Sequence, residues 1–218
     1  MTEKKKDTEL IIQIVIIAVL SLLLVYNIGK VSSGKDLEII KAVSASDVIP
    51  AGTPKIYGEE LGVNYDDISP NNPQKADATI RVLGNLDNTI TLAGEDLQRY
   101  VKIASQISCE YCCGAESIIF TKDVSQYKAG DAACGCAHSY AMRGLGKYLI
   151  KNHPTEFTDD EILSELGKWK VLFFPGIMEG KASVLKSKGI ELNYINLASN
   201  KYRGIEQGQA SGGMVGGC

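Results

Sequence analysis

The first long run of apolar positions lies near the N-terminus, where no charged residue occurs between Leu10 and Gly29. A helix over residues 10–29 would be about 30 Å long, which matches the hydrocarbon core of a bilayer. A buried core helix usually keeps one polar stripe, and this run has none. The pattern therefore predicts a transmembrane helix over residues 10–29, with the lipid bilayer as the partner of this segment.

Lysines on the two sides of this run predict its orientation. Three lysines precede it and two follow it closely, so the positive-inside rule favours a cytoplasmic N-terminus over residues 1–9. The remainder of the chain would then be extracytoplasmic. The expected localisation is the cell membrane, with a single pass.

Helical periodicity recurs in three later segments. Residues 95–107 repeat apolar side chains at helical spacing, and residues 138–151 do so through His138, Met142, Leu145 and Leu149. A third helix is expected to begin after Thr158, because Thr158 and Glu161 have the spacing of a capping box. Pro175 should end it.

Weaker patterns surround these helices. A short helix is expected over residues 181–187, ending near Gly189, and alternation over residues 190–197 predicts a strand. A second short strand is expected over residues 37–43. The fold class predicted from these elements is mainly α: an N-terminal single transmembrane helix, then a small helical, cysteine-rich exported domain with minor β.

Turn-forming residues mark the expected domain boundaries. Residues 30–75 carry Gly, Pro, Ser and Asp at short intervals, which is typical of a tether followed by irregular structure. The cysteine-rich helical domain would occupy residues 76–205. The glycine-rich residues 206–218 are expected to form a flexible tail.

Composition narrows the possible functions. Hydrophobic residues make up 44% and charged residues 22% of the 218 residues, as in an ordinary globular protein. The net charge of −3 argues against a broad cationic surface, so no nucleic-acid partner is expected. The chain has only 2 His but 6 Cys, most of them close together.

The cysteines form two short motifs that are typical of metal sites. The first is C-x2-C-C and the second is C-x-C-x-H, with residues 114–133 between them. Two soft-ligand motifs joined by such a loop can hold an ion with little core around it. Thiolates favour Zn²⁺ or Cu(I), and the sequence does not distinguish them. The candidate ligands are Cys109, Cys112, Cys113, Cys134, Cys136 and His138.

Disulfides are the main alternative, because cysteines of exported domains are more often bridged than bound to metal. The five clustered cysteines are an odd number, so bridging would leave one over unless Cys218 joined them. A bridge between the vicinal Cys112 and Cys113 would be strained. A mixture of bridges and metal ligands is also compatible with the pattern.

Motifs of common enzymes are absent from the sequence, including G-x-S-x-G, H-E-x-x-H and the phosphate-binding G-x-x-x-x-G-K-[ST]. The chain is therefore more readily interpreted as a binding protein than as an enzyme. The leading hypothesis is a membrane-anchored metal-binding protein. The alternatives are a disulfide-stabilised interaction module on the cell surface and a thiol-disulfide oxidoreductase using Cys134 and Cys136.

Three segments carry a resemblance to known sequences: ISCEYCCGA, GDAACGCAHSYAMRGLGKYLI and IPAGTPKIYGEELGVNYDDIS. They resemble uncharacterised membrane-anchored proteins of archaea and candidate bacterial phyla, a resemblance that implies no particular activity. CGCAHS also resembles the centre of the PCYCGC-motif lipoproteins, although Ala133 replaces the expected Tyr and no lipobox is present. This local resemblance implies a thiol-rich metal site.

Overall fold

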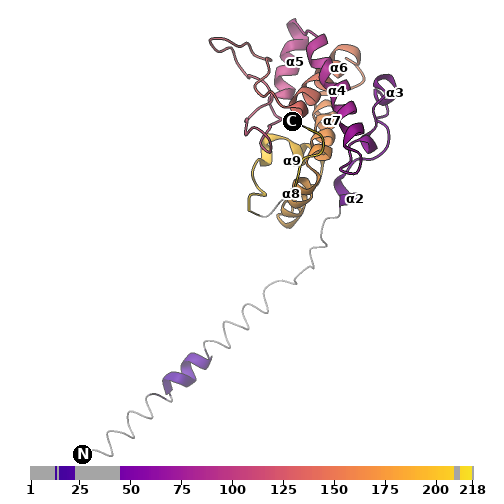
Figure 1. Cartoon of the computed structure of the whole chain (residues 1–218). Coiled ribbons are helices and arrows are strands. Elements are labelled where there is room, and N and C mark those ends of the chain that lie inside the picture. Colours follow the sequence, from indigo (N-terminus) through magenta and orange to yellow (C-terminus); the bar gives the residue numbers. More distant parts are fainter. Residues whose placement is uncertain (1–12, 14, 23–44, 209–211, 218) are drawn as a thin grey trace, which may run out of the picture. The chain divides into compact units, whose positions relative to one another are not determined.

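The computed structural model describes residues 13, 15–22, 45–208 and 212–217 of the chain (Figure 1). The chain divides into two units, Met1–Lys41 and Ala42–Cys218. The second unit contains the helices that position the cysteines. The predicted strand over residues 37–43 lies outside the described residues.

The predicted transmembrane helix is not found in the part of the chain that the structure describes, which leaves out residues 10–12, 14 and 23–29. Residues 13 and 15–22 are helical, but in the described part of the chain no helix has the length and apolar character needed to cross a membrane. The predictions of a single-pass anchor over residues 10–29, a cell-membrane localisation and an exported domain are therefore wrong on this finding.

The second unit is mainly helical, as predicted. Its longer helices are α4 (Pro73–Thr89), α5 (Gly94–Ala104), α6 (Ala137–Asn152), α7 (Asp159–Phe173) and α8 (Pro175–Ser187). The shorter elements are α2 (Ala45–Val48), α3 (Gly58–Leu61), α9 (Tyr194–Ala198) and the 3₁₀ helices η1 (Tyr65–Asp67) and η2 (Asn200–Tyr202).

Local sequence signals explain where α7 and α8 begin and end. The Thr158 side chain accepts a hydrogen bond from the Glu161 N–H, and Glu161 accepts one from the Thr158 N–H, which confirms the capping box. α7 ends just before Pro175, which occupies the first turn of α8. α8 therefore begins earlier than the helix predicted over residues 181–187, and Gly189 follows it with a positive φ of 68°.

The strand predicted over residues 190–197 is wrong. The Asn193 side chain accepts a hydrogen bond from the Asn196 N–H at 2.8 Å and caps α9. This cap turns the alternating segment into a helix that buries Leu197 and Ala198. In the described residues, β-structure consists of isolated bridges such as Ile107–Ser199.

The apolar spacing of the sequence did not predict α4. Asn72 caps it by accepting from the Lys75 N–H, and Pro73 takes a first-turn position. Its buried face includes Ala76, Ile80 and Leu83. The cap and the proline were visible in the sequence, but they lie in a segment rich in turn residues.

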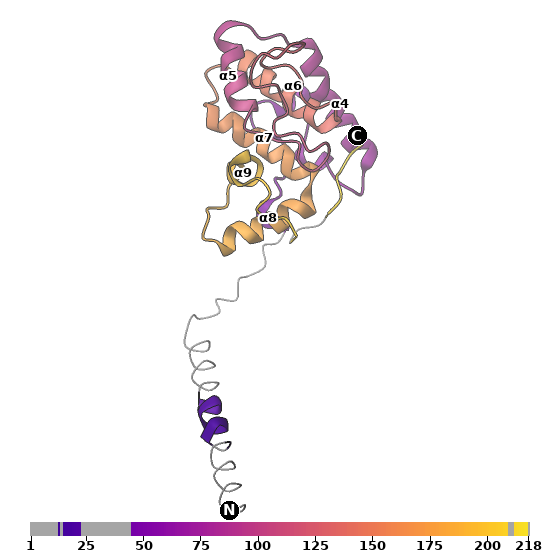
Figure 2. The same ribbon diagram turned by 90° about the vertical axis from the view of Figure 1, so that its left-hand side faces the viewer.

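α4 and α6 lie side by side and pack closely (Figures 1 and 2). Gly144 of α6 faces the backbone of α4, where an added Cβ would clash with the Leu83 carbonyl oxygen and lie 2.8 Å from the Asp87 nitrogen. Glycine at this position therefore sets how closely the two helices can approach. α7 contacts α5, α6, α8 and α9 and carries the fully buried Trp169 and Phe173.

The C-terminal segment 212–217 is packed against the helical unit, which differs from the flexible tail predicted over residues 206–218. Val215 is 4% exposed. Its N–H donates to the Phe173 carbonyl oxygen at 2.8 Å, and the Gly217 N–H donates to Asp77 at 2.9 Å. Burial of one apolar side chain and pairing of the backbone order this glycine-rich segment.

We expect Gly144→Ala to lower the free energy of unfolding by about 1–3 kcal/mol, because the new methyl group must push α4 and α6 apart. Gly146→Ala in the same helix is the matched control. Its Cβ would meet Tyr100 at an ordinary 3.5 Å, and alanine is the better helix former. Urea unfolding of both variants measures the difference. Equal stabilities would contradict the close-packing argument.

We also expect Val215→Ala to destabilise the protein by about 1–2 kcal/mol, because it removes buried apolar surface. Met214→Ala is the control, since Met214 is 45% exposed and its loss should change stability by less than about 0.5 kcal/mol. Thermal unfolding distinguishes the two variants. If neither variant shifts the melting temperature, the C-terminal segment does not contribute to the fold.

Candidate metal centre

The first cysteine motif is a closed backbone loop after α5. The Cys109 N–H donates to the Ala115 carbonyl oxygen at 3.0 Å, and the Gly114 N–H donates to the Cys109 carbonyl oxygen at 3.0 Å. Gly114 has a positive φ of 74°, which favours glycine at this turn. The loop places Cys109 in the core, while Cys112 is half-buried and Cys113 is exposed.

The second motif is positioned by the buried side chain of Arg143 in α6. Its guanidinium donates to the Cys134 carbonyl oxygen at 2.8 Å and to the Ile118 carbonyl oxygen at 3.2 Å. The same group pairs with Asp87 of α4 at 2.8 Å. Because Arg143 is completely buried, these bonds are shielded from water and hold the motif against the α4–α6 pair.

Cys136 is the N-cap residue of α6 and lies beside Cys109. The two sulfurs are 3.2 Å apart, and the Ser139 N–H donates to the Cys136 sulfur at 3.3 Å. Hydrogen bonding from the Cys109 thiol, followed by Ser139, lowers the pKa of Cys136 to about 6 against the opposing effect of burial. The contact with Cys136, together with burial, raises the pKa of Cys109. The thiolate form is therefore favoured at Cys136 over Cys109.

Five of the six predicted ligands come together in two overlapping groups. In each group the sulfur atoms lie within 4.8 Å of one another, a spacing that could hold a metal ion. One group is Cys109, Cys112 and Cys136, which we call the thiol cluster; the other is Cys109, Cys113 and Cys134. Cys113 and Cys134 are joined by a disulfide, whereas Cys109 and Cys136 are not disulfide-bonded.

Neither group contains His138. This side chain is completely buried, and its Nε2 lies 2.8 Å from the Val215 carbonyl oxygen. The ring packs against Phe173 and Phe174, with centroids 4.7 and 5.2 Å away. Burial lowers the pKa of His138, which favours the neutral imidazole. The structure thus places His138 in contact with the C-terminal segment.

A buried network of charges lies behind the first motif, and the sequence patterns above do not predict it. The Lys170 ammonium donates to Ser108 at 3.0 Å and to Glu110 at 3.1 Å, the two residues that flank Cys109. Lys181 lies 3.8 Å from Glu110. Burial lowers the pKa of Lys170 to about 8, opposed by Glu110. These contacts fix the first motif to α7 and α8.

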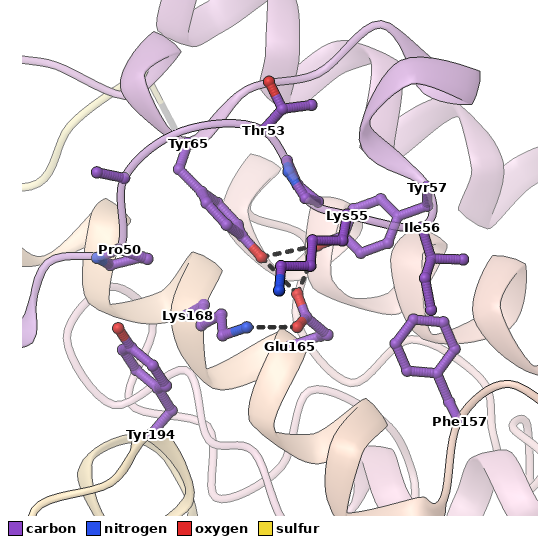
Figure 3. Close-up of a pocket in the computed structure, with 12 residues that line it drawn as sticks. Pro50, Thr53, Lys55, Ile56, Tyr57, Tyr65, Phe157, Glu165, Lys168 and Tyr194 are labelled. Carbon is purple, nitrogen blue, oxygen red and sulfur yellow. Dashed lines mark hydrogen bonds and ion pairs between the residues drawn. The ribbon is translucent and has the colours of Figure 1, made fainter.

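A separate cavity of about 460 Å³ lies between residues 50–57, α7 and the start of α9 (Figure 3). Glu165 accepts hydrogen bonds from the Tyr57 hydroxyl at 2.8 Å and the Tyr65 hydroxyl at 2.6 Å, and pairs with Lys168. The polar groups of this cavity are therefore largely paired with one another, which holds residues 50–65 on α7. No cysteine lines it.

Comparisons with protein-family models, with curated proteins and with solved structures find no match to this chain. The resemblances drawn from the cysteine motifs therefore remain predictions.

Ser139→Ala should raise the pKa of Cys136 toward that of an ordinary thiol, because the hydroxyl 3.3 Å from the sulfur is lost. The ultraviolet absorbance of the thiolate in metal-free protein, followed against pH, measures this change. Ser183→Ala is the matched control, since Ser183 donates within its own helix to Glu179. Coincident titration curves for the two variants would show that the hydroxyl does not stabilise the thiolate.

Proposed function

We propose that this protein binds a soft metal ion through the thiol cluster Cys109, Cys112 and Cys136. The single observation that carries the proposal is the convergence of the Cys109, Cys112 and Cys136 sulfurs within 4.8 Å of one another. Two thiolates bound to one ion at ~2.3 Å lie about 4 Å apart, so the observed spacing needs only small adjustments.

The number and type of ligands favour Cu(I) over Zn²⁺ while the disulfide is intact. Zn²⁺ in structural sites almost always takes four ligands, and among the described residues the thiol cluster offers three. Soft thiolates suit Cu(I). The lowered pKa of Cys136 also supports binding, because it favours the thiolate, which is the form that binds an ion.

The surroundings of the thiol cluster also support a binding role. Cys109 and Cys136 are buried and held by backbone hydrogen bonds on two separate segments. An ion bound by both sulfurs would join the loop after α5 to the N-terminus of α6. Binding to the folded state alone would stabilise the protein.

The test is anaerobic titration of the purified protein with Cu(I), using bicinchoninate as the competing ligand. We expect one ion per chain, and a loss of affinity of at least about 100-fold in the double variant Cys109→Ser, Cys136→Ser. The matched control is Cys113→Ser, Cys134→Ser, which removes the same number of sulfurs but leaves the thiol cluster. Equal affinities in the two double variants, or no binding by the unmodified protein, would refute the proposal.

A further inference from the structure

Cys109 and Cys136 lie in direct contact in the core of the protein. Their sulfurs are 3.2 Å apart, and neither cysteine is disulfide-bonded. A disulfide has a sulfur–sulfur distance of about 2.0 Å, so closing the pair needs a movement of only about 1 Å. The two residues are 27 positions apart in the sequence. The fold, and not their proximity in the chain, therefore brings the two sulfurs together.

The bridge between Cys113 and Cys134 joins the same two motifs beside this contact. A covalent link at this point limits how far the motifs can separate, and so keeps the Cys109 and Cys136 sulfurs close to each other. Arg143 holds the second motif independently, through its hydrogen bond to the Cys134 carbonyl oxygen. A second bridge would therefore run alongside the first and would join segments that are already held together.

We propose that Cys109 and Cys136 are a two-electron redox couple: a hydroperoxide oxidises them to a disulfide, and the oxidised pair no longer binds the metal ion. The inference rests on the proposed metal-binding function and adds a redox control to it. Its basis is that the two sulfurs in contact both belong to the thiol cluster. A sulfur in a disulfide is not a thiolate, so one bond would remove two of the proposed ligands at once.

The oxidation takes two steps. The Cys136 thiolate attacks one oxygen of the hydroperoxide, the O–O bond breaks, and the sulfur becomes a sulfenic acid, while the other oxygen takes up a proton and leaves as water or an alcohol. The Cys109 thiol then attacks the sulfenic sulfur. The S–S bond forms, and the sulfenic hydroxyl leaves as water with the Cys109 proton. Two electrons pass in total from the two sulfurs to the hydroperoxide.

Burial determines which sulfur reacts first and which class of oxidant can reach it. Cys136 is 9% exposed and Cys109 is 2% exposed, so an oxidant meets Cys136 first. The Ser139 N–H donates to the Cys136 sulfur at 3.3 Å, which stabilises the attacking thiolate. A small hydroperoxide reaches so buried a sulfur more readily than a molecular disulfide, whose own sulfur must approach the thiolate with its substituents. Cys109 needs no access to solvent, because it attacks from within the core.

Differential labelling of the metal-free protein tests the couple. Protein with its Cys113–Cys134 bridge intact is treated with hydrogen peroxide, and the excess is removed with catalase. Unbridged thiols are alkylated in denaturant with N-ethylmaleimide, and bridged cysteines are then reduced and labelled with the deuterated reagent. Mass spectrometry of the peptides should show that peroxide changes Cys109 and Cys136 from the first label to the second. The label on Cys112 should not change.

The matched controls are two variants that each remove one sulfur of the first motif. After peroxide treatment, Cys136 should still gain the second label in Cys112→Ser but not in Cys109→Ser, and circular dichroism verifies that both variants are folded. Unchanged labels in the peroxide-treated unmodified protein would overturn the couple, as would transfer of the second label to Cys112 in place of Cys109. If a variant does not fold, the labels of the unmodified protein still decide.

Titration with Cu(I) against bicinchoninate separates this inference from the proposed function. The peroxide-treated protein should bind Cu(I) at least about 100-fold more weakly than the untreated protein, because two ligands are lost. Equal affinities in the two states, with the new bridge formed, would overturn the redox control of metal binding. Absence of binding by the untreated protein would instead refute the proposed function and the metal control with it, while the labels still report whether the pair is oxidised.

Discussion

The buried guanidinium of Arg143 is the interaction on which the cysteine-rich region depends. It pairs with Asp87, and so joins α6 to α4, and it donates to the carbonyl oxygens of Ile118 and Cys134 in the loop that carries the second motif. Lys147 also pairs with Asp87 at 2.7 Å. Removing the arginine would leave the buried Asp87 carboxylate without one of its two cationic partners. It would also remove the hydrogen bonds that hold the loop of the second motif. Loss of one partner of a buried ion pair is strongly destabilising.

The thiol cluster is assembled on this frame from two chain segments that lack regular structure of their own. Cys109 lies in a loop after α5, fixed by the buried Lys170 through Ser108 and Glu110. Cys136 lies at the N-terminus of α6, where a backbone N–H stabilises its thiolate. The sulfurs therefore meet because buried charges hold the two segments in place, and a disulfide adds a covalent link between them.

Much of the helical framework was predictable because its signals are local. Apolar spacing and the Thr158 capping box placed α5, α6 and α7 within a few residues of their observed bounds. α4 was not predicted, because its cap and its proline lie among turn-forming residues. The strand expected over residues 190–197 is wrong, because Asn193 caps the helix α9 there. The membrane helix predicted from hydropathy has no counterpart among the helices that the structure describes. Side-chain capping acts within one turn and overrides weak alternation.

By itself, the sequence determined that this protein is mainly helical and that its cysteines gather in two motifs, since helical periodicity and ligand spacing are properties of neighbouring residues. Only the tertiary structure decided that Cys113 pairs with Cys134, that Cys109 lies beside Cys136, and that His138 faces the C-terminal segment. The physical reason is that these contacts join distant parts of the chain. Their geometry follows from the packing of α4 against α6 and from charges buried between helices, which no local pattern encodes.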